Sequence, residues 1–194
     1  MKTKRSAALC LGALLLMGLA TLDCSESQDR EPGTGVLELQ LTDAPLDVST
    51  IGAVFVVIEG ITVFPADDSN GGLVPTPISD TFPQTFNLLE LTDDRHALLA
   101  LVTLPAGLYS HMFVHLQSAW IDFDGDPNTD DIEPLTLVGG NKYNVILPFE
   151  IVAGGMVQKV IDFELRDPST GEVRINCTGD LTDCTLIPVL LPGK

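Results

Sequence analysis

Basic residues are scarce in this chain of 194 residues, which has 10 lysines and arginines against 27 aspartates and glutamates and a formal net charge of −17. Proteins bind the phosphate backbones of nucleic acids through clustered lysine and arginine side chains that release counterions. The sequence contains no such cluster. We therefore expect no nucleic acid partner, and anionic surfaces and acidic polymers are poor partners for the same reason.

The chain also has no hydrophobic run that approaches the roughly 20 residues needed to cross a bilayer as a helix. The uncharged stretch at residues 7–20 is shorter and follows the basic residues Lys2, Lys4 and Arg5. This combination is typical of a secretory signal peptide. We therefore predict export, with residues 1–23 as the signal peptide if cleavage precedes Cys24.

Cysteine is sparse, and the four cysteines have separate expected fates. Cys10 leaves with the signal peptide, whereas Cys177 and Cys184 are close enough in sequence to form a disulfide in an oxidising compartment. Cys24 is then left without a partner. A lipid attached to Cys24 would explain this odd cysteine, with residues 24–34 serving as a flexible polar tether.

Ordinary signal cleavage after Ala20 is the alternative, because residues 21–23 differ from the usual residues ahead of a lipidated cysteine. That alternative gives a soluble exported protein with a free thiol at Cys24. Removal of residues 1–20 leaves 7 basic and 27 acidic residues, so the mature chain carries a net charge of −20.

Familiar catalytic motifs are missing from the sequence. It has no nucleophile elbow of the G-x-S-x-G type, no H-E-x-x-H zinc motif, no phosphate loop and no dinucleotide fingerprint. We therefore predict that the protein is not an enzyme. A hydrolase based on two carboxylates is the remaining enzymatic hypothesis, because so many acidic residues always permit a pair.

The body of the chain has the period-two pattern of β-strands, in which apolar and polar residues alternate. Turns rich in glycine and proline separate the runs, and a helix at residues 88–101 is the main alternative element. This pattern predicts a single, mostly antiparallel β-sandwich over residues 35–192. The strand-like runs are 36–41, 53–64, 108–122, 143–151, 156–165 and 185–191.

One of these runs, residues 53–64, changes phase within itself. Its apolar residues up to Ile58 have one parity, and those from Ile61 onward have the other. A β-bulge at Glu59 and Gly60 would bring both sets to the core, with Gly60 supplying backbone freedom. In residues 108–122, Trp120 shares the parity of the apolar residues before it, which predicts a place in the core.

Two turns complete the set of structural predictions. Asp43 and Pro45 follow the first strand, where the aspartate side chain is expected to cap the turn. Gly107 closes the turn that precedes the strand at 108–122.

The sequence contains, in this order, the segments LTDAP (41–45), FNLLEL (86–91), LPAGLY (104–109), IDFELR (161–166) and IPV (187–189). Together these segments resemble a bacterial envelope family known as domain of unknown function 4382. The resemblance implies a β-sandwich of immunoglobulin-like or transthyretin-like form and a location in the cell envelope, because many members look like lipoproteins. It supplies no catalytic residues. It runs from about residue 35 to 191, and the chain departs from it by an acidic insert at 122–133 and by the excursion at 177–184.

The acidic insert is the candidate ligand site. Its oxygen-bearing side chains follow the spacing of a twelve-residue calcium loop, although Pro127 stands where that loop needs glycine. A strand also precedes it, so an EF-like loop between strands is one interpretation and a solvated hairpin tip with Asx turns is the other. The candidate ligands are Asp122, Asp124, Asp126, Asn128, Asp130 and Glu133.

The sequence as a whole predicts a non-catalytic, exported β-sandwich with a structural or binding role. We expect it to be an outer-membrane lipoprotein, or otherwise periplasmic or secreted. Its expected contact with the membrane is the lipid anchor alone, and its expected partner is an envelope protein or a polysaccharide. Calcium is the one possible cofactor, and calcium-dependent adhesion or carbohydrate binding is the alternative function.

Overall fold

The fold was obtained as a computed structural model, which describes residues 33–43, 51–66, 74–92, 95–124, 131–167, 169–178 and 183–193. The chain divides into two units, Met1–Arg30 and Glu31–Lys194, and the described residues all belong to the second. The predicted signal peptide and Cys24 lie outside the described residues. Among the described residues, no helix has the length and apolar character needed to span a bilayer.

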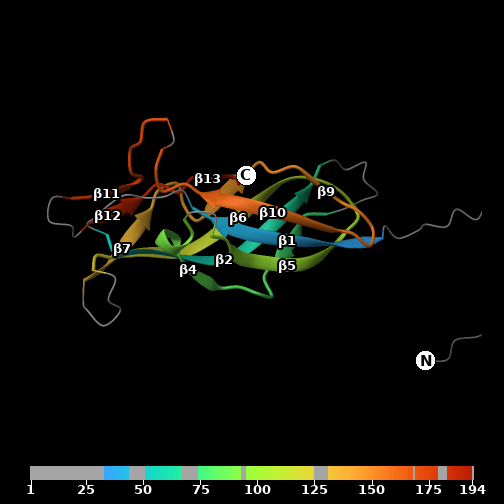
Figure 1. The fold of residues 1–194 in the computed structure, drawn as a ribbon, viewed down its shortest axis with the longest axis horizontal. Coiled ribbons are helices and arrows are strands. Elements are labelled where there is room, and N and C mark those ends of the chain that lie inside the picture. The colour runs from blue at the N-terminus through green and yellow to red at the C-terminus, as the bar shows by residue number, and fades with distance from the viewer. Residues whose placement is uncertain are drawn as a thin grey trace, which may run out of the picture. The chain divides into compact units, whose positions relative to one another are not determined.

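The second unit consists of β-strands arranged in two sheets (Figure 1). The smaller sheet has the order β13-β10-β1-β5 and consists of β1 (Thr34–Thr42), β5 (Ala97–Pro105), β10 (Met156–Phe163) and β13 (Leu190–Pro192). The larger sheet follows the path β11-β12-β7-β6-β2-β3, with β4 paired to β2 and with β8 and β9 paired to β6.

Its strands are β2 (Ala53–Pro65), β3 (Thr76–Ile78), β4 (Gln84–Asn87), β6 (Gly107–Asp122), β7 (Ile132–Leu137), β8 (Lys142–Val145), β9 (Phe149–Ile151), β11 (Ile175–Cys177) and β12 (Cys184–Leu186). Most pairs are antiparallel, but β1 pairs with β10, and β7 with β12, in parallel. The predicted all-β sandwich is therefore confirmed. The apolar residues of the two sheets form one buried cluster.

The long strands β2 and β6 form the ladder on which the larger sheet is built. Their register shifts between Ile58 and Gly60, so that Glu59 has no partner across the ladder. The bulge predicted from the phase change lies there, and it buries the apolar residues on both sides of it, including Ile58 and Ile61. Gly60 does not adopt a positive φ, so its predicted backbone freedom is not used, and that part of the prediction is wrong.

A matching irregularity on β6 changes the expected place of Trp120. Leu116 pairs with Ile58 and Ser118 pairs with Val57, which leaves Gln117 as an extra residue in the strand. Beyond this point the buried parity switches. Trp120 therefore lies on the opposite face from the core, half-buried, and its ring stacks on Phe55 with centroids 5.2 Å apart. The predicted core position of Trp120 is wrong because an extra residue shifts every later side chain to the other face.

The segment at 88–101 contains little helix. Asn87 caps a single 3-10 turn, Leu88–Glu90, by accepting a hydrogen bond from the Leu89 amide, and β5 takes up the following leucines. Gly107 lies in the turn between β5 and β6 with a φ of 154°, a value that residues other than glycine rarely adopt.

Truncation of a core residue tests how much the packing between the sheets contributes to stability. Leu39 on β1 is fully buried, so we expect Leu39→Ala to lower the free energy of unfolding by about 2–5 kcal/mol. Leu101 on the adjacent strand is 56% exposed, and Leu101→Ala should cost less than about 1 kcal/mol. Urea denaturation of both variants measures the difference. Equal losses would contradict the assignment of the two sheet faces.

Candidate functional site

The acidic insert connects the end of β6 to the start of β7. Asp122 is the last residue of β6 and pairs with Ile132, the first residue of β7, so the two strands form a hairpin. The backbone carbonyl of Asp122 also accepts a hydrogen bond from the amide of Gly52, 3.0 Å away. Asp122 is only 2% exposed, whereas Asp124 just beyond the strand lies in solvent.

Three carboxylates come together at the base of this hairpin. One oxygen atom each from Asp122, Asp124 and Asp131 lies within 4.8 Å of the others. The Asp124 amide donates a hydrogen bond to Oδ2 of Asp131 at 3.1 Å, which fixes the two sides of the hairpin against each other. Calcium takes oxygen ligands at about 2.4 Å, so two ligands of one ion are at most ~4.8 Å apart. The three carboxylates thus have a spacing that one calcium ion can bridge.

The cluster differs in membership from the predicted ligand set. Asp126, Asn128 and Asp130 lie outside the described residues. Glu133 is described but lies within β7 opposite Ile121, and it does not join the carboxylate cluster. Its predicted role as the twelfth ligand of an EF-like loop has no support in this geometry, because strand pairing fixes the backbone of Glu133 inside the sheet.

Asp131 is the residue that sequence reasoning missed. It occupies a non-ligand position of the twelve-residue calcium loop, so the spacing rule passes over it. A different signal was present. If β6 and β7 are antiparallel, the residue just before β7 must lie across from the residues just after β6. Asp131 follows this hairpin rule, with its carboxylate close to those of Asp122 and Asp124.

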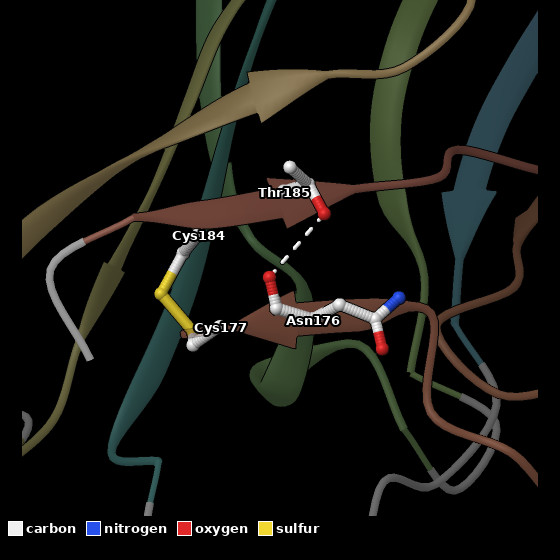
Figure 2. The surroundings of a disulfide bond; sticks show 4 residues. All are labelled: Asn176, Cys177, Cys184 and Thr185. Carbon is white, nitrogen blue, oxygen red and sulfur yellow. Dashed lines mark hydrogen bonds between the residues drawn. A yellow bond between two sulfur atoms is a disulfide. The ribbon is translucent and has the colours of Figure 1, made fainter. Parts of the chain in front are cut away.

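The predicted disulfide is confirmed and lies next to this hairpin in the sheet. Cys177 ends β11 and Cys184 begins β12, and the two are bonded (Figure 2). The hydroxyl of Thr185 donates a hydrogen bond to the backbone carbonyl of Asn176 at 3.3 Å. Cys184 pairs with Leu135 of β7, so the disulfide reinforces the strand that begins directly after the acidic insert.

The side chain of Asp43 makes a hydrogen bond outside the turn that it was predicted to cap. Its side chain is buried, and Oδ1 accepts a hydrogen bond from the amide of Leu165, which lies 122 residues away in sequence. This bond joins the end of β1 to the segment that follows β10. The predicted capping of the turn falls on residues 44–50, including Pro45, which lie outside the described residues.

A second group of carboxylates lies at the end of β10. Glu164 is only 7% exposed, and burial raises its pKa from the ordinary value near 4.5. The nearby charge of Asp162 and a hydrogen bond with its side chain raise the pKa of Glu164 further, while Arg174 opposes the shift. Asp167 behaves oppositely. Hydrogen bonds from Ser169 and Thr170, with a contribution from Arg174, lower its pKa to about 2.

Arg174 and Asp167 form a salt bridge at 3.0 Å and line a surface hollow of about 450 Å³. Glu164 is not among the residues that line this hollow. The carboxyl group with the raised pKa is thus buried beside Asp162 rather than presented to a substrate in that hollow.

The fold and the site define a small all-β sandwich domain with an acidic hairpin and an adjoining disulfide. The chain belongs to the family described as Domain of unknown function (DUF4382), which matches residues 34–174, well over half of the sequence. The match includes the acidic hairpin and ends before Cys177. Comparison with curated proteins and with solved structures finds no match.

The raised pKa of Glu164 predicts a pH-dependent stability. The folded protein binds a proton at Glu164 at a higher pH than the unfolded chain does, so this residue's contribution to stability falls as pH rises from about 4.5 through the folded pKa. Glu164→Gln keeps a hydrogen-bond donor toward Asp162 without the charge. We expect the variant to be more stable than the wild type at pH 7, with the difference shrinking toward pH 4.5.

Urea unfolding at several pH values between 4.5 and 7.5 measures this difference. Glu172→Gln is the matched control, because this substitution removes one negative charge nearby from a side chain that is exposed. A stability difference between Glu164→Gln and wild type that stays constant with pH would contradict the prediction.

Proposed function

We propose that this protein is a non-catalytic β-sandwich of the bacterial cell envelope, anchored by a lipid on Cys24, with a structural or binding role. The observation that carries the proposal is the disulfide between Cys177 and Cys184, because disulfides persist in oxidising compartments outside the cytosol. The basic residues and the apolar stretch at the N-terminus also support export from the cytosol. Pairing of Cys177 with Cys184 also leaves Cys24 as the odd cysteine of the mature chain.

The buried position of Glu164 supports a non-catalytic role. A carboxylate-based hydrolase needs two carboxyl groups facing a substrate-sized cleft, one of them with a raised pKa. Glu164 has the raised pKa, but it lies beside Asp162 and does not line the neighbouring hollow. This arrangement fits a structural role for the pair better than a catalytic one.

The lipid anchor is tested by the intact mass of the full chain after expression in a bacterial host and extraction from membranes. We expect cleavage before Cys24 and the added mass of a diacylglycerol on that residue. Cys24→Ala should abolish both and release the protein from the membrane fraction. A mature wild-type protein that begins at Thr21 and carries no lipid would contradict the anchor.

A second candidate function is calcium-dependent adhesion or polysaccharide binding through the acidic hairpin. The observation that favours it is the approach of the carboxylates of Asp122, Asp124 and Asp131, since hard oxygen ligands at this spacing suit calcium. The adjoining disulfide would hold the hairpin in place for a partner.

Calcium binding is tested by thermal unfolding in calcium and in chelator. Calcium at about 100 times its dissociation constant stabilises a folded protein by about 2.7 kcal/mol, which should raise the melting temperature by roughly 5–10 °C. Asp124→Asn should lose this increase, because it removes an exposed ligand without disturbing the core. Asp131→Asn should do the same.

Glu133→Gln is the discriminating control. It removes an acidic residue of the same loop that lies outside the carboxylate cluster, so its response to calcium should match that of the wild type. A wild-type melting temperature that is the same in calcium and in chelator would rule out the calcium site.

A further inference from the structure

At one end of the sandwich the described residues carry no charge over three stretches of the chain, although the protein as a whole is strongly acidic. We call this end the tip and define it as residue 33 with the turns at 105–108 and 152–156. The stretches 33–37, 97–110 and 151–158 contain no acidic or basic residue. Glu150, opposite Leu108 in the ladder, is the nearest charge on the strand that leads into the second turn.

The tip is a single tied structure and not a set of independent loops. The amide of Ala106 donates to the carbonyl of Gly33 at 2.6 Å, and the amide of Gly154 donates to the carbonyl of Thr34 at 2.8 Å. Both turns therefore hold the residues at which the described chain begins. Figure 1 shows β1 starting at the same end of the sandwich as β9.

Aromatic packing beneath the tip fixes its base. The ring of Tyr109 stacks on Phe149 with centroids 5.0 Å apart, and its hydroxyl donates to the carbonyl of Pro105 at 3.0 Å. Tyr109 is buried. The turn at 105–108 is thus anchored on the core and can present its side chains in a fixed orientation.

Large apolar side chains project into solvent at and beside this tip. Val152 is 60% exposed and Met156 is 65% exposed. Leu108 is also exposed and lines a mostly apolar hollow of about 470 Å³ together with Ile146 and Phe149, with Glu150 as its one charged lining residue. Val152 and Met156 belong to one turn, and exposed apolar side chains that are grouped, unlike those scattered singly, mark a contact with a protein or a membrane.

The position of the lipid decides which of these contacts is available. Gly33 is nine positions after Cys24 in the sequence, and nine Cα-to-Cα steps span at most ~32 Å even when the chain is fully extended. A lipid on Cys24 therefore keeps the tip within this distance of the bilayer. The acidic hairpin is at the other end of β6, whose 16 residues extend about 50 Å at ~3.3 Å per residue.

The distribution of charge favours an orientation in which the tip faces the bilayer. With cleavage before Cys24 the mature chain has 7 basic and 26 acidic residues and a net charge of −19, so most of its surface is repelled by anionic lipid headgroups. The described residues of the tip carry no charge and so add nothing to this repulsion. Burial of Val152 and Met156 at the headgroup boundary would also remove apolar surface from water.

We propose that the tip is a membrane-contact surface, in which Val152 and Met156 insert shallowly into the interface of the phospholipid bilayer. The proposal rests on the lipid anchor proposed above, which brings the tip to the membrane. In this orientation the acidic hairpin and the disulfide point away from the bilayer, where a partner can reach them.

The test places an environment-sensitive fluorophore on a new cysteine, Val152→Cys, in the full chain reconstituted into vesicles of phosphatidylethanolamine and phosphatidylglycerol. The native cysteines of the mature chain do not compete for the label, because Cys24 carries the lipid and the other two form the disulfide. Met156→Cys is a second probe of the tip. Thr136→Cys is the matched control, an exposed residue on β7 at the opposite end.

We expect a blue shift for both tip labels and loss of most of their fluorescence when the vesicles contain nitroxide-labelled lipid, with neither effect at residue 136. If the protein floats with the vesicles but both tip labels show neither a blue shift nor quenching, the proposed contact surface is wrong. The lipid anchor would be unaffected by that result. Quenching of the Thr136→Cys label as strong as at the tip would overturn the proposed orientation. Protein that does not float with the vesicles would overturn the anchor, and the contact surface with it.

Discussion

The antiparallel ladder between β2 and β6 is the constraint on which the rest of the larger sheet depends. Each of these strands is long enough to receive several short partners in succession, so that β3 and β4 pair along β2, and β7, β8 and β9 pair along β6. The ladder stays in phase with the core only because each strand has an extra residue near its middle, Glu59 on β2 and Gln117 on β6. These irregularities decide which side chains are buried beyond them.

The same ladder separates two chemically different ends. At one end β6 begins beside the two turns that hold the start of β1, and at the other it ends at Asp122 in the acidic hairpin. Strand rise makes the separation large and rigid, because a β-strand does not shorten without losing its pairs. A protein attached near β1 by a tether would therefore present its acidic end far from the attachment point.

Much of the fold was predictable from residue patterns. Alternation located β1, β2, β6 and β10 with bounds close to those observed, because each has one face against the core. The short strands β3, β4 and β11 were not predicted, since three or four residues carry too little periodicity. β5 was uncertain because its leucines at 98 and 101 are exposed while Leu99 is buried, which does not follow simple alternation.

The sequence by itself determined the all-β class, the bulge at Glu59, the pairing of Cys177 with Cys184 and the concentration of acidic residues after β6. These follow from local alternation and from the small number of cysteines. Only the tertiary structure decided that Asp131 joins Asp122 and Asp124 while Glu133 does not. Membership of that cluster depends on how two strands pair across a hairpin, and spacing along one chain does not contain that information.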